Sequence, residues 1–230
     1  MKFHSLKALF VLALFLLPLS GQSQASPRPE EVLASVQRFY EQTRTLQARF
    51  EQHFWMRIYR RTQSSRGTIA VARPGRIRFD YTEPRGKVIV STPEGFIYYE
   101  PGENGGPGQY ARGQIDASSA ALGFLTGTVD LARDFLFALR SPDDQSPPHT
   151  DPLELRPRRP DPNYRRLILY VDRRPEARGV VHRVAIEDHE GNWNRFDFSE
   201  FRFNREIPPS TFRFDPPQGA RLVELRSIRP

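Results

Sequence analysis

The chain contains no cysteine in its 230 residues, and this absence removes several possibilities at once. There can be no disulfide framework, no cysteine nucleophile and no lipid anchor attached through a cysteine side chain. The fold must therefore be stabilised by its hydrophobic core alone. Residues 26–230 are enough to build such a core, either as one larger all-β domain or as two small domains.

The sequence also lacks the motifs of common enzyme classes. We find no Gly-x-Ser-x-Gly elbow, no phosphate-binding loop and no glycine-rich dinucleotide turn. Four histidines follow residue 25 (His53, His149, His182 and His189), and none is paired at metal-ligand spacing. His189 has acidic neighbours on both sides, but it falls on a predicted hairpin turn, where solvated polar residues are common. We therefore expect no catalytic residue, no metal site and no cofactor: the protein is predicted not to be an enzyme.

Lysine is scarce, so the net charge of +7 comes almost entirely from arginine. Without Lys2 and Lys7 the charge falls from +7 to +5, and Lys87 is then the only lysine. The longest basic runs are pairs such as Arg60-Arg61, which is too little for a nucleic-acid-binding surface. We expect no nucleic-acid partner and interpret the basic surplus mainly as solvated surface.

A membrane-spanning hydrophobic run is missing as well. The apolar segment 8–19 falls short of the ~20 residues that a spanning helix needs. Lys2 and Lys7 precede it, and small residues at Ser23 and Ala25 follow it. This order predicts a secretory signal peptide over residues 1–25, cut after Ala25. Residues 26–230 are then expected to form a single soluble domain outside the inner membrane.

The first half of this domain predicts one helix followed by a meander of strands. Apolar residues at helical spacing indicate an amphipathic helix over 30–43, with Glu30 and Glu31 in its first turn. From Leu46 to Ile58 the apolar period changes to two, which predicts a long half-buried strand. Turn-forming residues then separate four shorter predicted strands, at 67–71, 76–81, 87–91 and 95–100.

The second half predicts a helical insert and a second set of strands. Residues 116–139 are expected to be helical in two pieces parted at Gly127, with Asp116 and Asp130 near their N-termini. A proline-rich loop covers 141–151. Strands are expected at 153–156, 166–172, 180–188, 192–203 and 212–219. The alternation Phe196, Phe198, Phe201, Phe203 contains one slip, which is typical of a β-bulge.

These elements predict a mainly β protein with helices (α+β), built on a curled antiparallel sheet. A sheet of about ten strands curls, and the helices are the elements available to fill its concave face. The 17 Phe, 8 Tyr and 2 Trp fall largely on alternating strand positions, which indicates an aromatic core. Some of these side chains could equally line a cavity for an apolar ligand.

An ordered set of motifs runs through the chain, and a predicted helix leads into the first of them. The motifs are Phe50-Glu51-Gln52, Gly67-Thr68-Ile69, Ala72-Arg73-Pro74-Gly75-Arg76-Ile77-Arg78-Phe79-Asp80-Tyr81, Ile97-Tyr98-Tyr99-Glu100-Pro101 and Phe212-Arg213-Phe214-Asp215-Pro216-Pro217-Gln218-Gly219-Ala220. Taken together, this ordered set resembles the LolA-type carriers that ferry lipoproteins to the outer membrane, and the last motif is a close match to the family ending.

The resemblance implies an incomplete antiparallel β-barrel whose hydrophobic cavity is covered by the N-terminal helix and a short helical lid. It implies a monomeric periplasmic carrier that binds the acyl chains of lipoproteins. Such a carrier is loaded by an inner-membrane ABC transporter and delivers to an outer-membrane receptor lipoprotein. By position, Arg73 is the arginine that bonds the lid backbone and holds the lid closed. The expected cavity residues are Val36, Phe50, Phe54, Ile77, Phe79, Tyr81, Val88, Val90, Ile97, Leu122, Phe124 and Leu125.

Three other functions remain open at this stage. The same cup could carry another envelope lipid, such as a glycolipid. The fold could also serve as a lipid-sensing regulatory domain that signals through a membrane partner. An exported hydrolase is the third, and it requires a polar cluster in the pocket.

Overall fold

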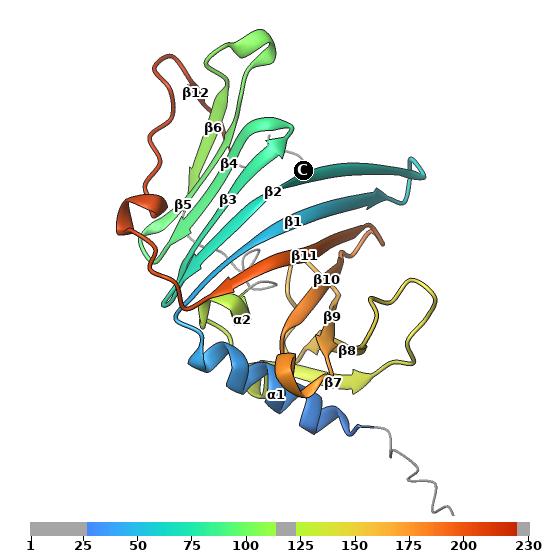
Figure 1. The fold of residues 1–230 in the computed structure, drawn as a ribbon. Helices are drawn as coiled ribbons and strands as arrows, with labels where there is room; N and C mark the ends of the chain where they lie inside the picture. The colour runs from blue at the N-terminus through green and yellow to red at the C-terminus, as the bar shows by residue number, and fades with distance from the viewer. Residues whose placement is uncertain (1–26, 114–122, 225–230) are drawn as a thin grey trace, which may run out of the picture.

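The computed structural model describes residues 27–113 and 123–224, and its dominant feature is one open, curled sheet of 12 strands (Figure 1). The strand order is β12-β6-β5-β4-β3-β2-β1-β11-β10-β9-β8-β7. Each neighbouring pair is antiparallel except the parallel pair β12–β6. The fold predicted from the sequence, a mainly β protein with a curled sheet and few helices, is confirmed.

Two meanders build the sheet and meet where β1 pairs with β11. The first half consists of α1 (Pro29–Gln42), β1 (Thr45–Met56), β2 (Arg61–Ala72), β3 (Arg76–Glu83), β4 (Arg85–Thr92), β5 (Gly95–Glu100), η1 (Glu103–Gly105) and β6 (Gln109–Gly113). The second half consists of α2 (Gly123–Thr126), α3 (Leu131–Asp134), β7 (Phe135–Leu139), β8 (Thr150–Pro157), β9 (Arg166–Asp172), η3 (Pro175–Ala177), β10 (Val181–Glu187), β11 (Trp193–Phe203), η4 (Pro209–Phe212) and β12 (Arg221–Leu222). No helix of these described residues is long and apolar enough to cross a membrane.

The inner, concave face of the sheet holds the main core because residues of one parity along β1 are apolar. Leu46, Ala48 and Phe50 are buried, while the intervening Arg49 and Glu51 are exposed. Gly67 lies opposite Phe50 on β2, and a Cβ there would meet the Phe50 ring at 2.9 Å and the Asp80 carbonyl oxygen at 2.1 Å. A glycine at this position therefore lets the aromatic ring lie flat against the sheet.

Helix α1 covers part of this inner face. Pro29 occupies its first turn together with Glu30 and Glu31, a favourable charge at the N-terminal end of the helix dipole. One side of the helix is buried in the main core through Val32, Leu33, Val36 and Tyr40. The Tyr40 hydroxyl accepts a hydrogen bond from the backbone N–H of Val181 at 3.3 Å, which ties the helix to β10.

A second, smaller core lies on the outer face of β2, β4 and β5. The segment 205–220, which we call the C-terminal strap, runs along this face (Figure 1). Ile207 and Phe212 of the strap pack with Ala70, Val88, Val90 and Tyr99. Arg78 holds the strap by donating to the carbonyls of Thr211 at 2.9 Å and Arg213 at 3.1 Å.

Several sequence-based boundaries need correction. The predicted helix over 116–139 is wrong at its end, because Phe135–Leu139 pairs with β8 as strand β7. No strand forms over 212–219, where the chain leaves the 3₁₀ helix η4 and runs irregularly to β12. Ile58 does not continue β1 but lies in the β1–β2 turn, 81% exposed.

The predicted slip in β11 is confirmed as a register shift between Gln47 and Arg49 of β1, its partner strand. The signal peptide, Asp116 and Leu122 lie outside the described residues.

Candidate functional site: the aromatic inner face and its helical cover

Five aromatic side chains from β1, β3 and β11 meet on the inner face of the sheet. Phe50 is at their centre, with ring centroids 5.3 Å from Phe79, 5.0 Å from Tyr81 and 6.1 Å from Phe196. Phe196 stacks on Phe198 at 6.2 Å. Alternation places these residues together, because directly paired residues such as Phe50 and Phe198 point to the same face.

Short helix α2 and the end of α1 belong to the same apolar core as this surface. The rings of Tyr40 and Phe124 meet edge to face with centroids 5.1 Å apart. Phe124 and Leu125 are buried and belong to the same core cluster as Phe50 and Phe79. The helical cover therefore contributes apolar side chains to the sheet's inner face, and does not merely pass over it.

Most of the predicted cavity residues come together in this cluster. The structure unites seven of them there: Val36, Phe50, Ile77, Phe79, Tyr81, Phe124 and Leu125. Phe54 has the same parity as Phe50 on β1 and is half-buried farther along the strand. Whether these side chains line a lipid cavity stays a prediction.

Val88, Val90 and Ile97 lie on the outer face, so their predicted place on the cavity side is corrected. Val90 pairs with Arg78 and Ile97, whereas Phe79 pairs with Ile89. Val88 and Val90 pack in the second core against the C-terminal strap. Because the strap covers the outer face of β4, both faces of this strand are apolar, and the alternation that would assign a face is lost.

The inner face also contains residues that the sequence did not single out. Ile89 and Tyr98 are paired to each other and share the face of Phe79. Lys87 lies on the same face, with Nζ 4.6 Å from the Tyr81 ring centroid and 5.0 Å from that of Tyr98. Burial lowers the pKa of Lys87. The sequence offered one signal for Lys87, because it is the only lysine after residue 25.

A short polar chain interrupts the apolar inner face near Tyr81. The Tyr81 hydroxyl donates to Gln52 Oε1 at 2.9 Å, and Gln52 Nε2 donates to Asn194 Oδ1 at 2.9 Å. Burial raises the pKa of Tyr81, so its hydroxyl stays protonated. These groups satisfy one another, and no group of three or more His, Asp or Glu side chains within the described ranges could hold a metal ion.

Arg73 directly follows β2 and contacts both covering helices, α1 and α2. Its guanidinium Nη1 donates to the Tyr40 carbonyl near the end of α1. The same guanidinium lies against Gly127, directly after α2, and burial lowers its pKa. The backbone N–H of Gly75, two residues on, donates to the Thr126 carbonyl of α2 at 3.1 Å. The predicted role of Arg73 in closing a lid is a proposal that this placement supports.

The fold and the site thus define a mainly β protein, an open curled sheet whose aromatic inner face lies under short helices. Residues 41–215 match the family model described as "Outer membrane lipoprotein carrier protein LolA". The chain therefore belongs to the LolA family, a family of lipoprotein carriers, as the sequence resemblance predicted.

Individual relatives are similar in sequence to this chain over most of their length. An outer-membrane lipoprotein carrier protein of Dechloromonas aromatica is 29% identical over 185 residues, 80% of this chain and 84% of that protein. Another, of Alkalilimnicola ehrlichii, is 27% identical and covers 93% of this chain and 90% of that protein. Among solved structures, a LolA superfamily protein of Nitrosomonas europaea has a TM-score of 0.43 at 12% identity, over 82% of this chain and 99% of that chain.

Proposed function

We propose that this protein is a periplasmic carrier that holds the acyl chains of lipoproteins against its aromatic inner face and shuttles them to the outer membrane. In this scheme an inner-membrane ABC transporter loads it and an outer-membrane receptor lipoprotein receives the cargo. The observation that carries the proposal is the combination of that face with a helical cover, α2 (Gly123–Thr126), whose Phe124 and Leu125 join the same apolar core.

The energetics favour such an arrangement. Each CH₂ group kept from water is worth ~0.8 kcal/mol, so exposing one chain of about 16 carbons costs ~13 kcal/mol. A carrier must offset most of that cost and still release its cargo. Phe124 and Leu125 supply apolar surface that can cover the sheet when it is empty and flank an acyl chain when it is loaded. Binding then becomes a population shift between closed and open positions of α2.

The direct test is to purify the protein from the envelope of its native host and identify the bound molecules by mass spectrometry. Triacylated peptides support the proposal, whereas a glycolipid would assign the fold to a different envelope lipid. Depletion of the protein in the same host should make lipoproteins accumulate at the inner membrane. Unchanged lipoprotein sorting after depletion would overturn the proposed shuttle.

A matched pair of variants links this activity to the inner face. Phe79 on the inner face and Phe212 on the outer face are equally buried, at 6% and 5% exposure. Each change to alanine should destabilise the fold by about 3–5 kcal/mol. Only Phe79→Ala should also weaken binding of a fluorescent fatty acid, compared at equal folded fraction. Equal weakening by Phe212→Ala would argue against an inner-face site.

A further inference from the structure

The β1–β2 hairpin projects beyond the rest of the sheet (Figure 1). On one side, β3 begins to pair with β2 only at Arg66, so residues 61–65 pair with β1 alone. On the other side, β11 ends its pairing at Trp55. The turn 57–60, which we call the hairpin tip, therefore extends past both neighbouring strands.

The hairpin tip has the wrong residues for an ordinary solvent-exposed turn. Turns favour Gly, Asn, Asp, Pro and Ser, but this one reads Arg57-Ile58-Tyr59-Arg60. Ile58 is 81% exposed and Tyr59 73% exposed. Arg60 adopts a positive φ of 48°, which glycine or asparagine would accept more easily. Sites where a sequence breaks such local rules are where function is expected.

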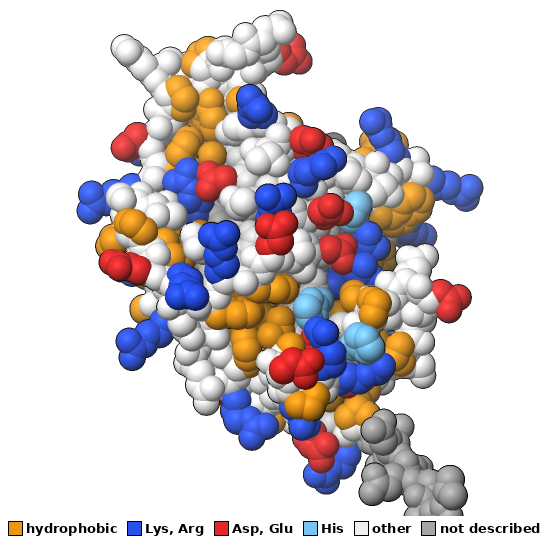
Figure 2. Space-filling view, viewed as in Figure 1, with side chains coloured by type: hydrophobic (Ala, Val, Ile, Leu, Met, Phe, Trp, Pro, Cys, Tyr) orange, Lys and Arg blue, Asp and Glu red, His pale blue; other side chains and the backbone are white. Residues whose placement is uncertain are grey.

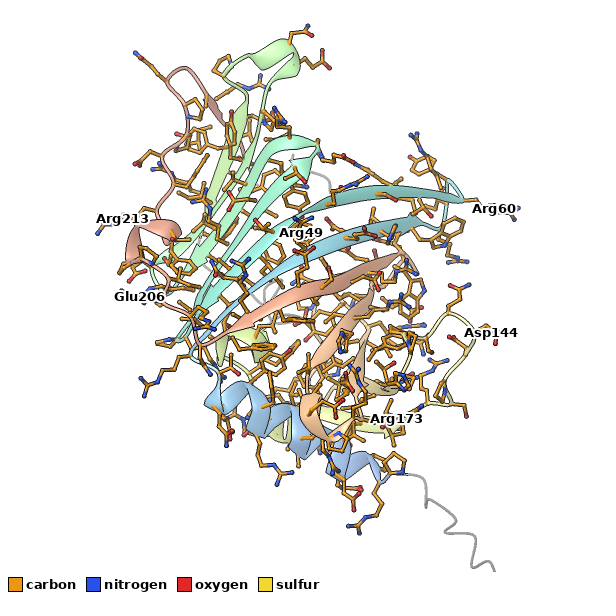
Figure 3. All side chains as sticks on the ribbon, in the orientation of Figure 1. Arg49, Arg60, Asp144, Arg173, Glu206 and Arg213 are labelled. Atoms are coloured by element: carbon orange, nitrogen blue, oxygen red, sulfur yellow. The ribbon has the colours of Figure 1, made fainter. Side chains whose placement is uncertain are left out.

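Positive charge surrounds these apolar side chains. Arg57, Arg60 and Arg61 flank Ile58 and Tyr59 within five consecutive residues. Over the described ranges, no carboxylate forms an ion pair with any of the three. Figure 3 shows Arg60 pointing away from the sheet at the far end of the hairpin, and Figure 2 shows blue and orange side chains together there.

The neighbouring β10–β11 turn supports the hairpin tip without neutralising it. Arg57 donates from its backbone N–H to Asn192 Oδ1 at 2.9 Å and from Nη1 to the backbone carbonyl of Glu190 at 3.2 Å. The carboxylate of Asp188 is engaged inside its own turn by the N–H groups of Glu190 and Asn192 at 2.9 and 2.8 Å. The tip is thus held in place while Ile58 and Tyr59 remain uncovered.

We propose that the hairpin tip is a membrane-contact element that inserts Ile58 and Tyr59 into the interface of an anionic lipid bilayer. Aromatic rings with a polar end favour the headgroup region, and exposed aliphatic side chains favour the acyl boundary next to it. Arginines near an anionic surface add attraction that salt weakens. A protein partner could use the apolar residues, but the three flanking arginines favour a surface of negative lipid headgroups.

Vesicle sedimentation tests this proposal with residues 26–230, the chain that follows the predicted signal peptide. We expect binding to vesicles of phosphatidylcholine with phosphatidylglycerol, and much weaker binding to pure phosphatidylcholine. The double change Ile58→Ser and Tyr59→Ser places ordinary turn residues at the tip and should lower partitioning at least tenfold. Leu136→Ser is the matched control, because Leu136 is also exposed, at 52%, but lies on β7. It should bind vesicles like the unchanged protein.

Two double variants distinguish electrostatic attraction at the hairpin tip from the effect of the protein's overall charge. Arg60→Gln with Arg61→Gln should weaken binding to the anionic vesicles about fivefold per arginine. Arg202→Gln with Arg205→Gln removes the same charge from exposed positions on β11 and just after it, beside the end of β1 that is farther from the tip, and should have little effect. Equal binding by the unchanged protein and the serine double variant, or absence of vesicle binding by both, would overturn the proposal.

The vesicle assay uses empty protein, so its outcome does not depend on the proposed cargo. The serine double variant should still bind a fluorescent fatty acid like the unchanged protein. Loss of vesicle binding with intact fatty-acid binding supports the tip as a separate membrane contact. Parallel loss of both would place the vesicle effect in the inner face and overturn the assignment to the tip.

Discussion

Arg73 and Gly127 fit against each other so closely that a side chain at position 127 would require the Arg73 guanidinium to move. A Cβ built on Gly127 would lie 2.3 Å from Arg73 Nη2, and Gly127 has a φ of +76°. The guanidinium thus occupies the space that any other residue at 127 would need. This contact joins the end of α2 to the same arginine that bonds the Tyr40 carbonyl of α1.

Gly127→Ala should therefore displace Arg73 and loosen α2. The ideal control is Gly105→Ala, because Gly105 has a nearly equal φ of +78° but nothing within 4 Å of an added Cβ. Both changes carry a strain cost of about 1 kcal/mol or more. Gly127→Ala should cost about 1–3 kcal/mol beyond that by breaking the half-buried hydrogen bond from Arg73 to the Tyr40 carbonyl. Urea unfolding measures the difference, and equal losses in the two variants would contradict the fit.

Arg73→Leu should weaken the closed position of α2 while leaving the sheet intact. It removes the donor to the Tyr40 carbonyl and the contact with Gly127. Backbone amides of residues 123–126 should exchange with deuterium faster, and cargo transfer should suffer more than loading. Arg73→Lys keeps the charge with fewer donors and should give an intermediate effect. Equal exchange in the leucine variant and the unchanged protein would refute a lid-closing role for Arg73.

The sequence alone could predict the elements whose two faces differ in polarity. On β3 the apolar Ile77 and Phe79 alternate with Arg76 and Arg78, so strand and face were both readable. On β4 the strap covers Val88 and Val90 on the outer face, so the apolar residues of β4 do not show which side of the strand faces inward. The strap comes from more than 100 residues later in the chain, and no local pattern announces that contact.

Strand β7 shows the same limit for the type of element. Phe135-Leu136-Phe137-Ala138-Leu139 is a short apolar run directly after α3, and periodicity cannot separate a buried strand from a helix over five residues. Its pairing with β8, from Phe135 opposite Pro157 to Leu139 opposite Leu153, decides the matter. The N-cap at Asp130 was predictable, because aspartate is a preferred N-cap residue. In the structure its side chain accepts a hydrogen bond from the backbone N–H of Arg133, three residues on.

Asp172 should make the protein less stable in acid. Burial alone would raise its pKa, but hydrogen bonds from the side chain and backbone of Arg174 and from His182 outweigh burial and lower the pKa from 3.8 to about 2. A carboxyl group whose pKa is lowered in the folded protein stabilises the fold at pH values above its ordinary pKa, here by about 2 kcal/mol. This contribution should disappear as the pH falls from about 4 to about 2.

Unfolding in urea across this pH range tests the assignment to Asp172. Asp172→Asn should be less stable than the unchanged protein by about 2 kcal/mol at pH 7, with the gap closing in acid. Asp144→Asn, in the exposed loop before β8 (Figure 3), removes the same charge and should leave stability unchanged at every pH. A gap for Asp172→Asn that stays constant with pH would mean that titration of this carboxylate is not its cause.

Neighbouring residues on β4 provide the sharpest test of which sheet face meets the ligand. Ile89 shares the inner face with Phe79, whereas Val90 is buried under the strap. Ile89→Thr should weaken binding of a fluorescent fatty acid about fourfold, the equivalent of one lost CH₂ contact, with a small effect on stability. Val90→Thr buries a hydroxyl in the second core and should lower stability by about 1–3 kcal/mol without changing affinity. The two variants thus predict opposite effects from adjacent positions, and weaker fatty-acid binding by folded Val90→Thr would place the ligand on the wrong side of the sheet for the proposed carrier.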